Sequence, residues 1–392
     1  MRLASQDGWA QARNVLCVRL DALGDVLMTT PAIRALRESV PGRRITLLTS
    51  PGGAAIVPLV PEIDEVIAYG APWVKATQAR ADSGADHVMI ERLRGGRYDA
   101  AVIFTVYSQN PLPAVLLCYL ADIPRRLAHC HENPYQLLTH WIPDPEPSAL
   151  VRHEVRRQLD LVAAVGARTR NERLSLRVDP AAASRARHAL RAAGVDPGDR
   201  FVVIHPGASA PSRRYPPEAF TVVAREIVNR LGCPVVFTGS GGERDLVEGI
   251  RRSMGCASAS LAGRLSLAEM AALLALAPVL VSNNTGPVHM AAAVGTPVVD
   301  LYALTNPQHA PWQVPSRVLF QDVPCRYCYK SVCPEQHHRC LRGVTPASVV
   351  EAVSEFLDER RRRTGVMEEA PPLPDALGST RAVDGPVPGG PG

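Results

Sequence analysis

The sequence lacks any apolar segment long enough to cross a bilayer. Its longest apolar run, residues 271–281, falls well short of the roughly 20 residues that a membrane-spanning helix requires. Residues 1–13 also lack the apolar stretch of a secretory signal peptide, so we expect a cytoplasmic protein. With 46% hydrophobic and 21% charged residues in a chain of 392, the composition indicates a globular protein of two or three domains.

Common nucleotide-binding and metal-binding motifs are missing as well. The chain has only two lysines, Lys75 and Lys330, and neither follows a glycine, which excludes a P-loop. The glycine-rich stretch 239–244 has Arg244 where the dinucleotide fingerprint requires its last glycine, so a dehydrogenase is disfavoured. No Asp-x-Asp triplet occurs, so a metal clamped on a diphosphate by paired carboxylates is not indicated. The net charge of +5 identifies no partner by itself.

What the sequence does contain is a repeated alternation of short apolar runs and amphipathic stretches. In the first half, strands are predicted at 14–20, 44–49, 65–69 and 101–105, and the last helix at 153–165. The stretch that carries His129, His131 and His140 is irregular, and these histidines are predicted to lie in a surface loop. The polar, alanine-rich segment 168–199 is expected to hold the connection between domains.

The second half repeats this order. Its predicted strands lie at 201–205, 234–238, 279–282 and 297–301, and its predicted helices at 217–230, 243–254, 266–277 and 288–294. Two such halves predict an α/β fold of two Rossmann-like, doubly wound parallel-sheet domains that face a ligand cleft. The expected parts are a flexible N-terminus at 1–13, a first domain at 14–175, a second domain at 176–345, a final helix at 346–359 and a disordered tail at 360–392.

Asp25 is the first candidate functional residue. It follows the first predicted strand and opens a helix, at the edge where open α/β sheets bind ligands. A carboxylate in this place can simply cap the first helical turn. It can also act as a general base for a substrate hydroxyl, and the residue pattern leaves both roles open.

Three loops of the second half precede helices in equivalent positions. They span 205–214, 239–243 and 283–289. Small residues let backbone N–H groups approach an anion, and hydroxyl or arginine side chains can complete a diphosphate site. Any one loop could be an ordinary turn, but three that converge predict a diphosphate site in which helix termini and Arg213 or Arg214 meet the charge.

Three segments, in this order, resemble the motifs of glycosyltransferase family 9, which includes the ADP-heptose:lipopolysaccharide heptosyltransferases. They are VRLDALGDVLMTTPA at 18–32, HPGA at 205–208 with RYP at 214–216, and NTGPVHMAAA at 284–293. The resemblance extends over about residues 14–359. It implies a GT-B fold in which the first domain holds the acceptor and the second the sugar nucleotide. It also implies inverting, metal-independent transfer that requires no cofactor.

The resemblance further implies roles for single residues. Asp25 matches the catalytic base, and Asp21 and Gly24 lie on the acceptor side of its loop. Many members carry Asp where this chain has Asn284, which leaves the identity of the sugar open. The residues implied for donor binding are Ser209, Ser212 and Arg213 at the phosphates, Gly241 and Glu243 near the nucleoside, and Asn284, Thr285, Gly286 and His289 in the donor loop.

The expected function is therefore transfer of a heptose or related sugar from ADP-heptose to a hydroxyl of a lipopolysaccharide core or related glycoconjugate. Alternatives are another nucleotide sugar, a secondary-metabolite acceptor, or nucleotide-sugar binding without catalysis, which the intact Asp25 disfavours. Nucleic acid is not an expected partner. The arginines at 125–126 and 360–363 could contact the inner membrane surface, although a solvated charged surface is the simpler explanation.

Four cysteines form a cluster in the sequence: Cys325, Cys328, Cys333 and Cys340. Four thiolates can hold a structural zinc ion or an iron–sulfur centre. The spacing matches no strong zinc signature, so reduced cysteines that pack a surface loop are the favoured explanation.

Overall fold

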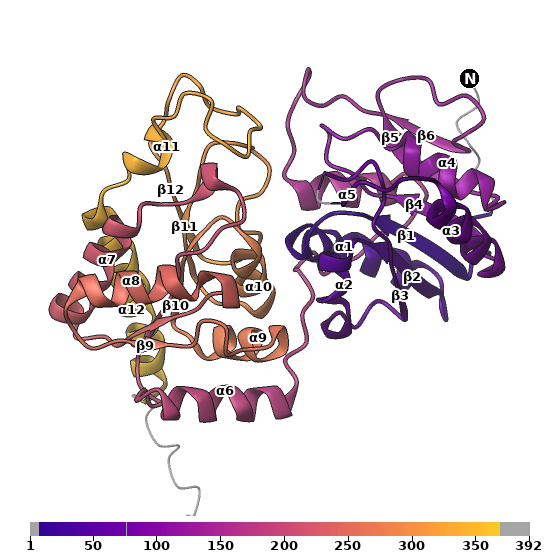
Figure 1. Ribbon diagram of the computed structural model, residues 1–392. Helices are drawn as coiled ribbons and strands as arrows, with labels where there is room; N and C mark the ends of the chain where they lie inside the picture. Colours follow the sequence, from indigo (N-terminus) through magenta and orange to yellow (C-terminus); the bar gives the residue numbers. More distant parts are fainter. Residues whose placement is uncertain (1–7, 76, 369–392) are drawn as a thin grey trace, which may run out of the picture.

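The computed structural model describes residues 8–75 and 77–368, which form two α/β halves (Figure 1). The strands of the first half are β1 (Asn14–Arg19), β2 (Arg44–Thr49), β3 (Glu65–Ala68), β4 (Ala100–Ile103), β5 (Arg126–Cys130) and β6 (His140–Pro143). Its helices are α1 (Leu23–Ser39), α2 (Pro51–Ala54), η1 (Val57–Leu59), α3 (Gly84–Gly95), α4 (Leu112–Leu120) and α5 (Glu154–Ala163).

The second half begins with a helix that packs on α9. Its strands are β7 (Val202–His205), β8 (Val235–Phe237), β9 (Ala259–Ser260), β10 (Val279–Asn283), β11 (Val298–Leu301) and β12 (Ser316–Leu319). Its helices are α6 (Pro180–Ala192), η2 (Pro211–Arg213), α7 (Pro217–Leu231), η3 (Gly241–Glu243), α8 (Arg244–Met254), α9 (Leu267–Leu276), α10 (Gly286–Val294), α11 (Arg339–Arg342) and α12 (Pro346–Glu368).

Both sheets have the same topology. The strand orders are β3-β2-β1-β4-β5-β6 and β12-β11-β10-β7-β8-β9, and every neighbouring pair is parallel. Each half therefore starts in the middle of its sheet and winds outward in both directions, which is the order of a Rossmann fold. The predicted fold class is confirmed.

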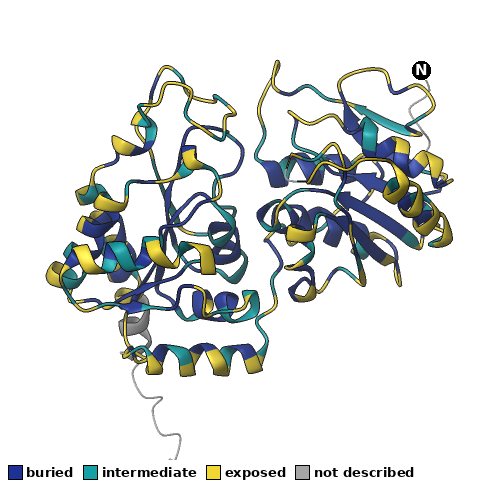
Figure 2. Ribbon diagram, in the orientation of Figure 1, coloured by how far each residue is buried: buried dark blue, intermediate teal, exposed yellow. Residues whose placement is uncertain are grey.

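Helix α1 brings the two halves together. Its residues from Val26 to Leu36 are buried on all sides, because α1 packs against α5 in its own half and against α10 in the other. Figure 2 shows the buried strands of each sheet between partly exposed helices. The N-terminus of α1 therefore lies beside the N-terminus of α10, at the carboxyl edges of both sheets.

Two strands of the first half break the apolar pattern and were not predicted. The segment with His129, His131 and His140 was expected to be a surface loop, but His129 is buried on β5 and His140 lies on β6. His131 is exposed in the loop between these strands, as expected. Arg126 on β5 is buried too, and its guanidinium donates to the carbonyls of Ile123, Gln136 and Leu137. Arg126 is thus unavailable for the membrane contact considered from the sequence.

The chain crosses between the halves after residue 177. The N–H of Arg177 donates to Leu59 O in the first half, whereas α6 packs on α9 in the second. Near the start of the chain, Trp9 lies in the predicted flexible segment but is buried in the core. Helix α12 continues to Glu368, past its predicted end at 359, since arginine favours helix; the remainder of the predicted tail lies outside the described residues. None of the helices in the described part of the chain is long and apolar enough to cross a membrane.

Candidate active site

A buried arginine gathers three carboxylates at the end of β1. Arg19 is fully buried, and its nitrogens lie 2.9 Å from Asp21 Oδ2, 3.2 Å from Asp25 Oδ1 and 2.7 Å from Glu154 Oε1. Sequence reasoning found Asp21 and Asp25 but missed Arg19 and Glu154. A signal was present, because Arg19 is a lone charge within the apolar run of the first strand.

The environment of Asp25 suits a proton acceptor. Burial raises the pKa of Asp25 above its ordinary value, and the positive charge of Arg19 opposes this rise. Burial raises the pKa of Asp21 in the same way, and Gln109 Nε2 donates to its Oδ1 at 2.6 Å. The Asp25 side chain keeps 21% of its surface exposed, so a hydroxyl can reach it. A raised pKa makes a carboxylate a stronger base.

The first turn of α10 lies against the first turn of α1. A Cβ built on Gly24 would come within 2.8 Å of His289 Cδ2, and a Cβ on Gly286 within 2.8 Å of Leu23 Cδ1. A side chain on Gly24 would therefore displace the buried ring of His289, whereas at Gly286 the end of the Leu23 side chain would have to move. Thr285 is the N-cap residue of α10, and its hydroxyl donates to Asn283 O at 3.3 Å.

The side chain of Asn283, which precedes the predicted donor residues, links two of the predicted loops by hydrogen bonds. Its Nδ2 donates to Pro206 O at 2.8 Å, and its Oδ1 accepts from the Tyr215 N–H at 2.9 Å. The loops 205–214 and 283–289 are therefore one connected structure at the carboxyl ends of β7 and β10.

His289 is held in the neutral form. Burial, together with the neighbouring charges of His153 and Arg213, lowers the pKa of His289 to about 3. Its Nδ1 is buried and has no hydrogen-bond partner among the described residues. The ring thus cannot supply a positive charge to an anionic ligand.

Arg213 supplies that charge. Its Nη2 donates to Asn306 Oδ1 at 2.8 Å, and its guanidinium lies close enough to Asp25 and Asp300 to lower the pKa of both carboxyls. The predicted phosphate-binding arginine and the predicted base thus come from different halves and lie close enough to interact electrostatically.

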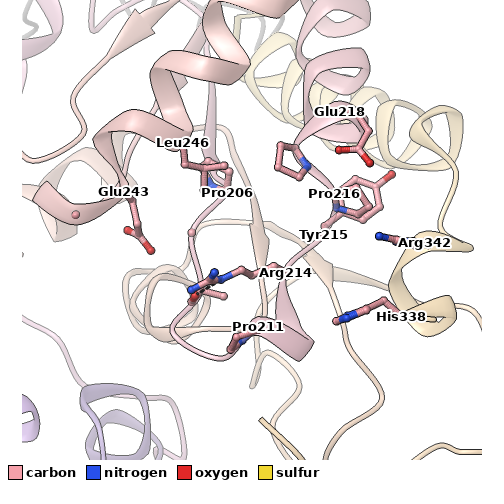
Figure 3. A pocket seen from close by; sticks show the side chains of 14 residues that line it. Pro206, Pro211, Arg214, Tyr215, Pro216, Glu218, Glu243, Leu246, His338 and Arg342 are labelled. Atoms are coloured by element: carbon pink, nitrogen blue, oxygen red, sulfur yellow. Dashed lines mark hydrogen bonds between the residues drawn. The ribbon is translucent and has the colours of Figure 1, made fainter. Parts of the chain in front are cut away.

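A second group of predicted residues lines a pocket of about 390 Å³ beside β7 and β8 (Figure 3). Glu243 extends into it, accepts from Ser240 N at 2.7 Å and packs over Gly207, where a Cβ would overlap its carboxylate. Gly241 is exposed and lies outside the lining. The other side chains of the wall include Arg214, Tyr215, Glu218, Leu246, His338 and Arg342.

Ser212 holds a neighbouring loop in place. Its hydroxyl donates to Lys330 O at 2.8 Å and its N–H to Ser331 O at 3.0 Å, whereas Ser209 is exposed. Because its proton is engaged, we expect Ser212 to fix the cysteine-containing loop and Ser209 to be free for a phosphate. That loop also contacts the first half, through Lys75 Nζ to Ser331 Oγ at 3.0 Å and the edge-to-face rings of Tyr107 and Tyr329.

The four clustered cysteines line one cavity of about 20 Å³. Cys325 Sγ lies 3.7 Å from His337 Nε2. Across residues 8–75 and 77–368, no three His, Cys, Asp or Glu side chains are arranged to hold a metal ion together.

Comparisons with known proteins find similarity to heptosyltransferases. The chain is 27% identical to lipopolysaccharide heptosyltransferase 3 of Escherichia coli over 302 residues, 76% of this chain and 85% of the relative. It is also 27% identical to lipopolysaccharide heptosyltransferase 1 of Pseudomonas aeruginosa over 325 residues, 82% of this chain and 88% of the relative.

Solved structures share the fold. A glycosyl transferase family 9 protein from Veillonella parvula matches with a TM-score of 0.73 at 22% identity, over 91% of this chain and 100% of the other. The ADP-heptose lipopolysaccharide heptosyltransferase II of Escherichia coli matches with a TM-score of 0.69 at 22% identity, over 89% of this chain and 99% of the other. Residues 87–339 match the sequence model of glycosyltransferase family 9 (heptosyltransferase), and because this match spans more than half of the chain, the protein belongs to that family.

Proposed function

We propose that this glycosyltransferase moves a heptose from ADP-heptose to a hydroxyl of a lipopolysaccharide core or related glycoconjugate, with inversion and without a metal. The observation that carries the proposal is the placement of Asp25, held by Arg19 in one half, opposite Arg213 and the N-terminus of α10 in the other. The names of the relatives support the sugar and the acceptor.

In this mechanism Asp25 takes the proton of the acceptor hydroxyl. The hydroxyl oxygen forms a bond to the anomeric carbon while the bond from that carbon to the diphosphate oxygen breaks on the opposite face, which inverts the configuration. The electron pair of the broken bond stays on the departing nucleoside diphosphate. Arg213 and the first N–H groups of α10 stabilise its developing charge.

We place the nucleoside of the donor in the pocket of about 390 Å³. Its volume lies within the range of small-molecule sites. Glu243 contributes a carboxylate to its wall, Arg214 a guanidinium and Gly207 a stretch of backbone without a side chain. The connected loops at β7 and β10 lead from this pocket toward Arg213 and α10. The diphosphate would lie along that path.

Asp25→Asn tests the mechanism. We expect at least a 1000-fold loss of transfer, because an amide cannot take the proton, with the Kd for ADP changed less than twofold. Asp122→Asn is the matched control, since this carboxylate is 74% exposed on the first half. Near-normal turnover of Asp25→Asn would overturn the assignment of the base.

The donor and the stereochemistry need separate measurements. Purified enzyme with a panel of nucleotide sugars, scored for release of ADP, UDP or GDP, distinguishes ADP-heptose from another donor, and release of none supports a non-catalytic binder. NMR of the product's anomeric proton distinguishes inversion from retention. Unchanged rates in excess EDTA are expected for metal-independent transfer.

For the cysteine cluster we propose reduced thiols that pack the loop. Cys325 and Cys340 lie against the small apolar cluster of Tyr302, Leu304 and Val323, which supports a packing role. Mass spectrometry of the elements in purified protein should find well under one zinc or iron per chain. One equivalent that survives dialysis would instead support the metal centre considered from the sequence.

We also propose contact with the inner membrane surface, and with it a cytoplasmic location. Neighbouring helices α3 and α4 expose Val88, Leu116, Tyr119 and Leu120, an apolar surface that a lipid bilayer could cover. Leu116→Glu with Leu120→Glu should abolish cosedimentation with anionic phospholipid vesicles, whereas Val222→Glu on the second half should not. Equal sedimentation of both variants would overturn the proposal.

A further inference from the structure

A carboxylic acid is buried within the strand next to the donor loop. Asp300 occupies the third position of β11, between Val299 and Leu301, and has no exposed surface. In the sheet it pairs with Ser282 of β10 on one side and Val318 of β12 on the other. Neither Asp300 nor its strand is part of the mechanism proposed above.

Asp300 contacts the donor loop through one residue. Asn284 Nδ2 donates to Asp300 Oδ2 at 2.9 Å and to His309 O at 2.9 Å. A backbone carbonyl can only accept a hydrogen bond, so the atom of Asn284 that faces His309 O must be the NH₂ group. Both hydrogens of that group are then used, and the orientation of the amide is fixed.

The other end of the amide is left without a partner. Asn284 Oδ1 accepts no hydrogen bond from the described residues. This oxygen is not fully buried, so a ligand can reach it. The next two residues, Thr285 and Gly286, form the start of α10, and Gly286 touches Leu23 in the turn that carries Asp25. The oxygen therefore belongs to the loop that faces the reacting groups.

We propose that Asp300 is a positioning residue: together with His309 O it orients Asn284 so that the amide oxygen accepts a hydrogen bond from a hydroxyl of the donor sugar. This inference rests on the proposed function and adds a determinant of donor choice. The site has a neutral acceptor at this point, so it favours a sugar with a free hydroxyl there over one in which that hydroxyl is missing or is replaced by a group that only accepts.

A double-mutant cycle tests the proposal, with KM for the nucleotide sugar and Kd for ADP as separate readouts. Asp300→Leu is close in size but cannot accept, and we expect it to raise KM at least tenfold with the Kd for ADP changed less than twofold. Asp300→Asn keeps an acceptor oxygen and should stay within threefold of wild type. Asn284→Ala should raise KM as much as Asp300→Leu.

The double variant separates positioning from a general structural role. If Asp300 acts through Asn284, Asp300→Leu/Asn284→Ala should match Asn284→Ala within twofold. Effects that multiply, or an equal loss of ADP affinity in Asp300→Leu, would overturn the proposal. If Asp300→Leu does not fold, the proposal is still tested by Asn284→Ala and Asp300→Asn. An unchanged KM in Asn284→Ala is enough to overturn the proposal.

Failure of the proposed function gives a different result. A wild-type protein that uses no ADP-heptose overturns the donor assignment, and the cycle is then measured with the nucleotide sugar that the panel identifies. Binding of no nucleotide sugar by the wild type overturns both.

Discussion

The backbone of Gly24 lies against the imidazole of His289, and this contact joins the two halves at the proposed reaction centre. A methyl group on Gly24 would come within 2.8 Å of His289 Cδ2, closer than carbon atoms approach without displacement. His289 is buried on α10 and Gly24 is buried in the first turn of α1, one residue before Asp25. The distance between base and donor loop is thus set by a residue without a side chain.

Gly24→Ala should therefore separate the two loops. We expect kcat to fall by about 100-fold, since a displacement near 1 Å can cost that much in rate, while the Kd for ADP stays within twofold because no residue of the second half is replaced. Steady-state kinetics and calorimetry measure the two effects. Gly249→Ala is the matched control, because a Cβ there meets no atom within 4 Å in the middle of α8. A wild-type kcat in Gly24→Ala would show that this approach is not needed.

The acid limb of the pH–rate profile should respond to Arg19 and Glu154 in opposite directions. The charge of Arg19 lowers the pKa of Asp25 and the charge of Glu154 raises it. Arg19→Gln should thus move the acid limb to higher pH, because the base then stays protonated over a wider range. Glu154→Gln should move it to lower pH.

Profiles of kcat/KM between pH 5 and 9 check this pair, with Glu226→Gln on the surface of α7 as the control. Arg19→Gln leaves buried carboxylates unpaired and is expected to destabilise the protein by about 3–5 kcal/mol. Arg19→Lys keeps the charge and provides a milder variant. Shifts of the same sign in the Arg19 and Glu154 variants would exclude Asp25 as the titrating group.

Much of the framework was predictable from the sequence because parallel strands covered on both faces are continuous apolar runs. Strand β2 has the predicted bounds, 44–49, and the capping box of Ser266 and Glu269 at the start of α9 forms as the residue spacing indicates. Strand β5 carries both Arg126 and His129, β12 has only two apolar residues, and β9 has only two residues in all, so their apolar runs are too short to be recognised.

The active site was only partly predictable for a related reason. Asp25 and Arg213 follow loop motifs that are local in the sequence, whereas Arg19, Glu154 and Asp300 act through partners distant in the chain. Ser212 shows that a residue in a correctly predicted loop can have a different role from the one expected. It lies in the expected loop, but its hydroxyl is engaged by the cysteine-containing loop more than 100 residues away.

Arg213→Ala should weaken binding of the nucleoside diphosphate. A hydrogen bond to a charged group contributes about 1.5–3 kcal/mol, so the Kd for ADP should rise roughly 10-fold to 150-fold. Calorimetry measures this change, and Arg230→Ala at the end of α7 is the control, since its partner Glu226 is on the surface. An unaltered Kd would refute the role of Arg213 in diphosphate binding.

The stability of the protein should depend on pH through Asp300. Burial raises the pKa of Asp300 from 3.8 to about 8, and Asn284 and Arg213 oppose the rise. Between these two values the folded protein holds a proton that the unfolded chain has released. The corresponding stability is fully present below pH 3.8 and is lost as the pH rises through about 8.

Asp300→Asn has no proton to lose at this position. Its free energy of unfolding, relative to wild type, should increase by about 2–4 kcal/mol from pH 5 to pH 8 and then level off, given at most about 1.4 kcal/mol per pH unit. Urea unfolding at several pH values measures this difference in free energy. For the control Asp122→Asn, at an exposed carboxylate, the difference from wild type should not change with pH. A flat difference for Asp300→Asn would mean that Asp300 is ionised throughout, stabilised by Arg213 more strongly than its burial allows.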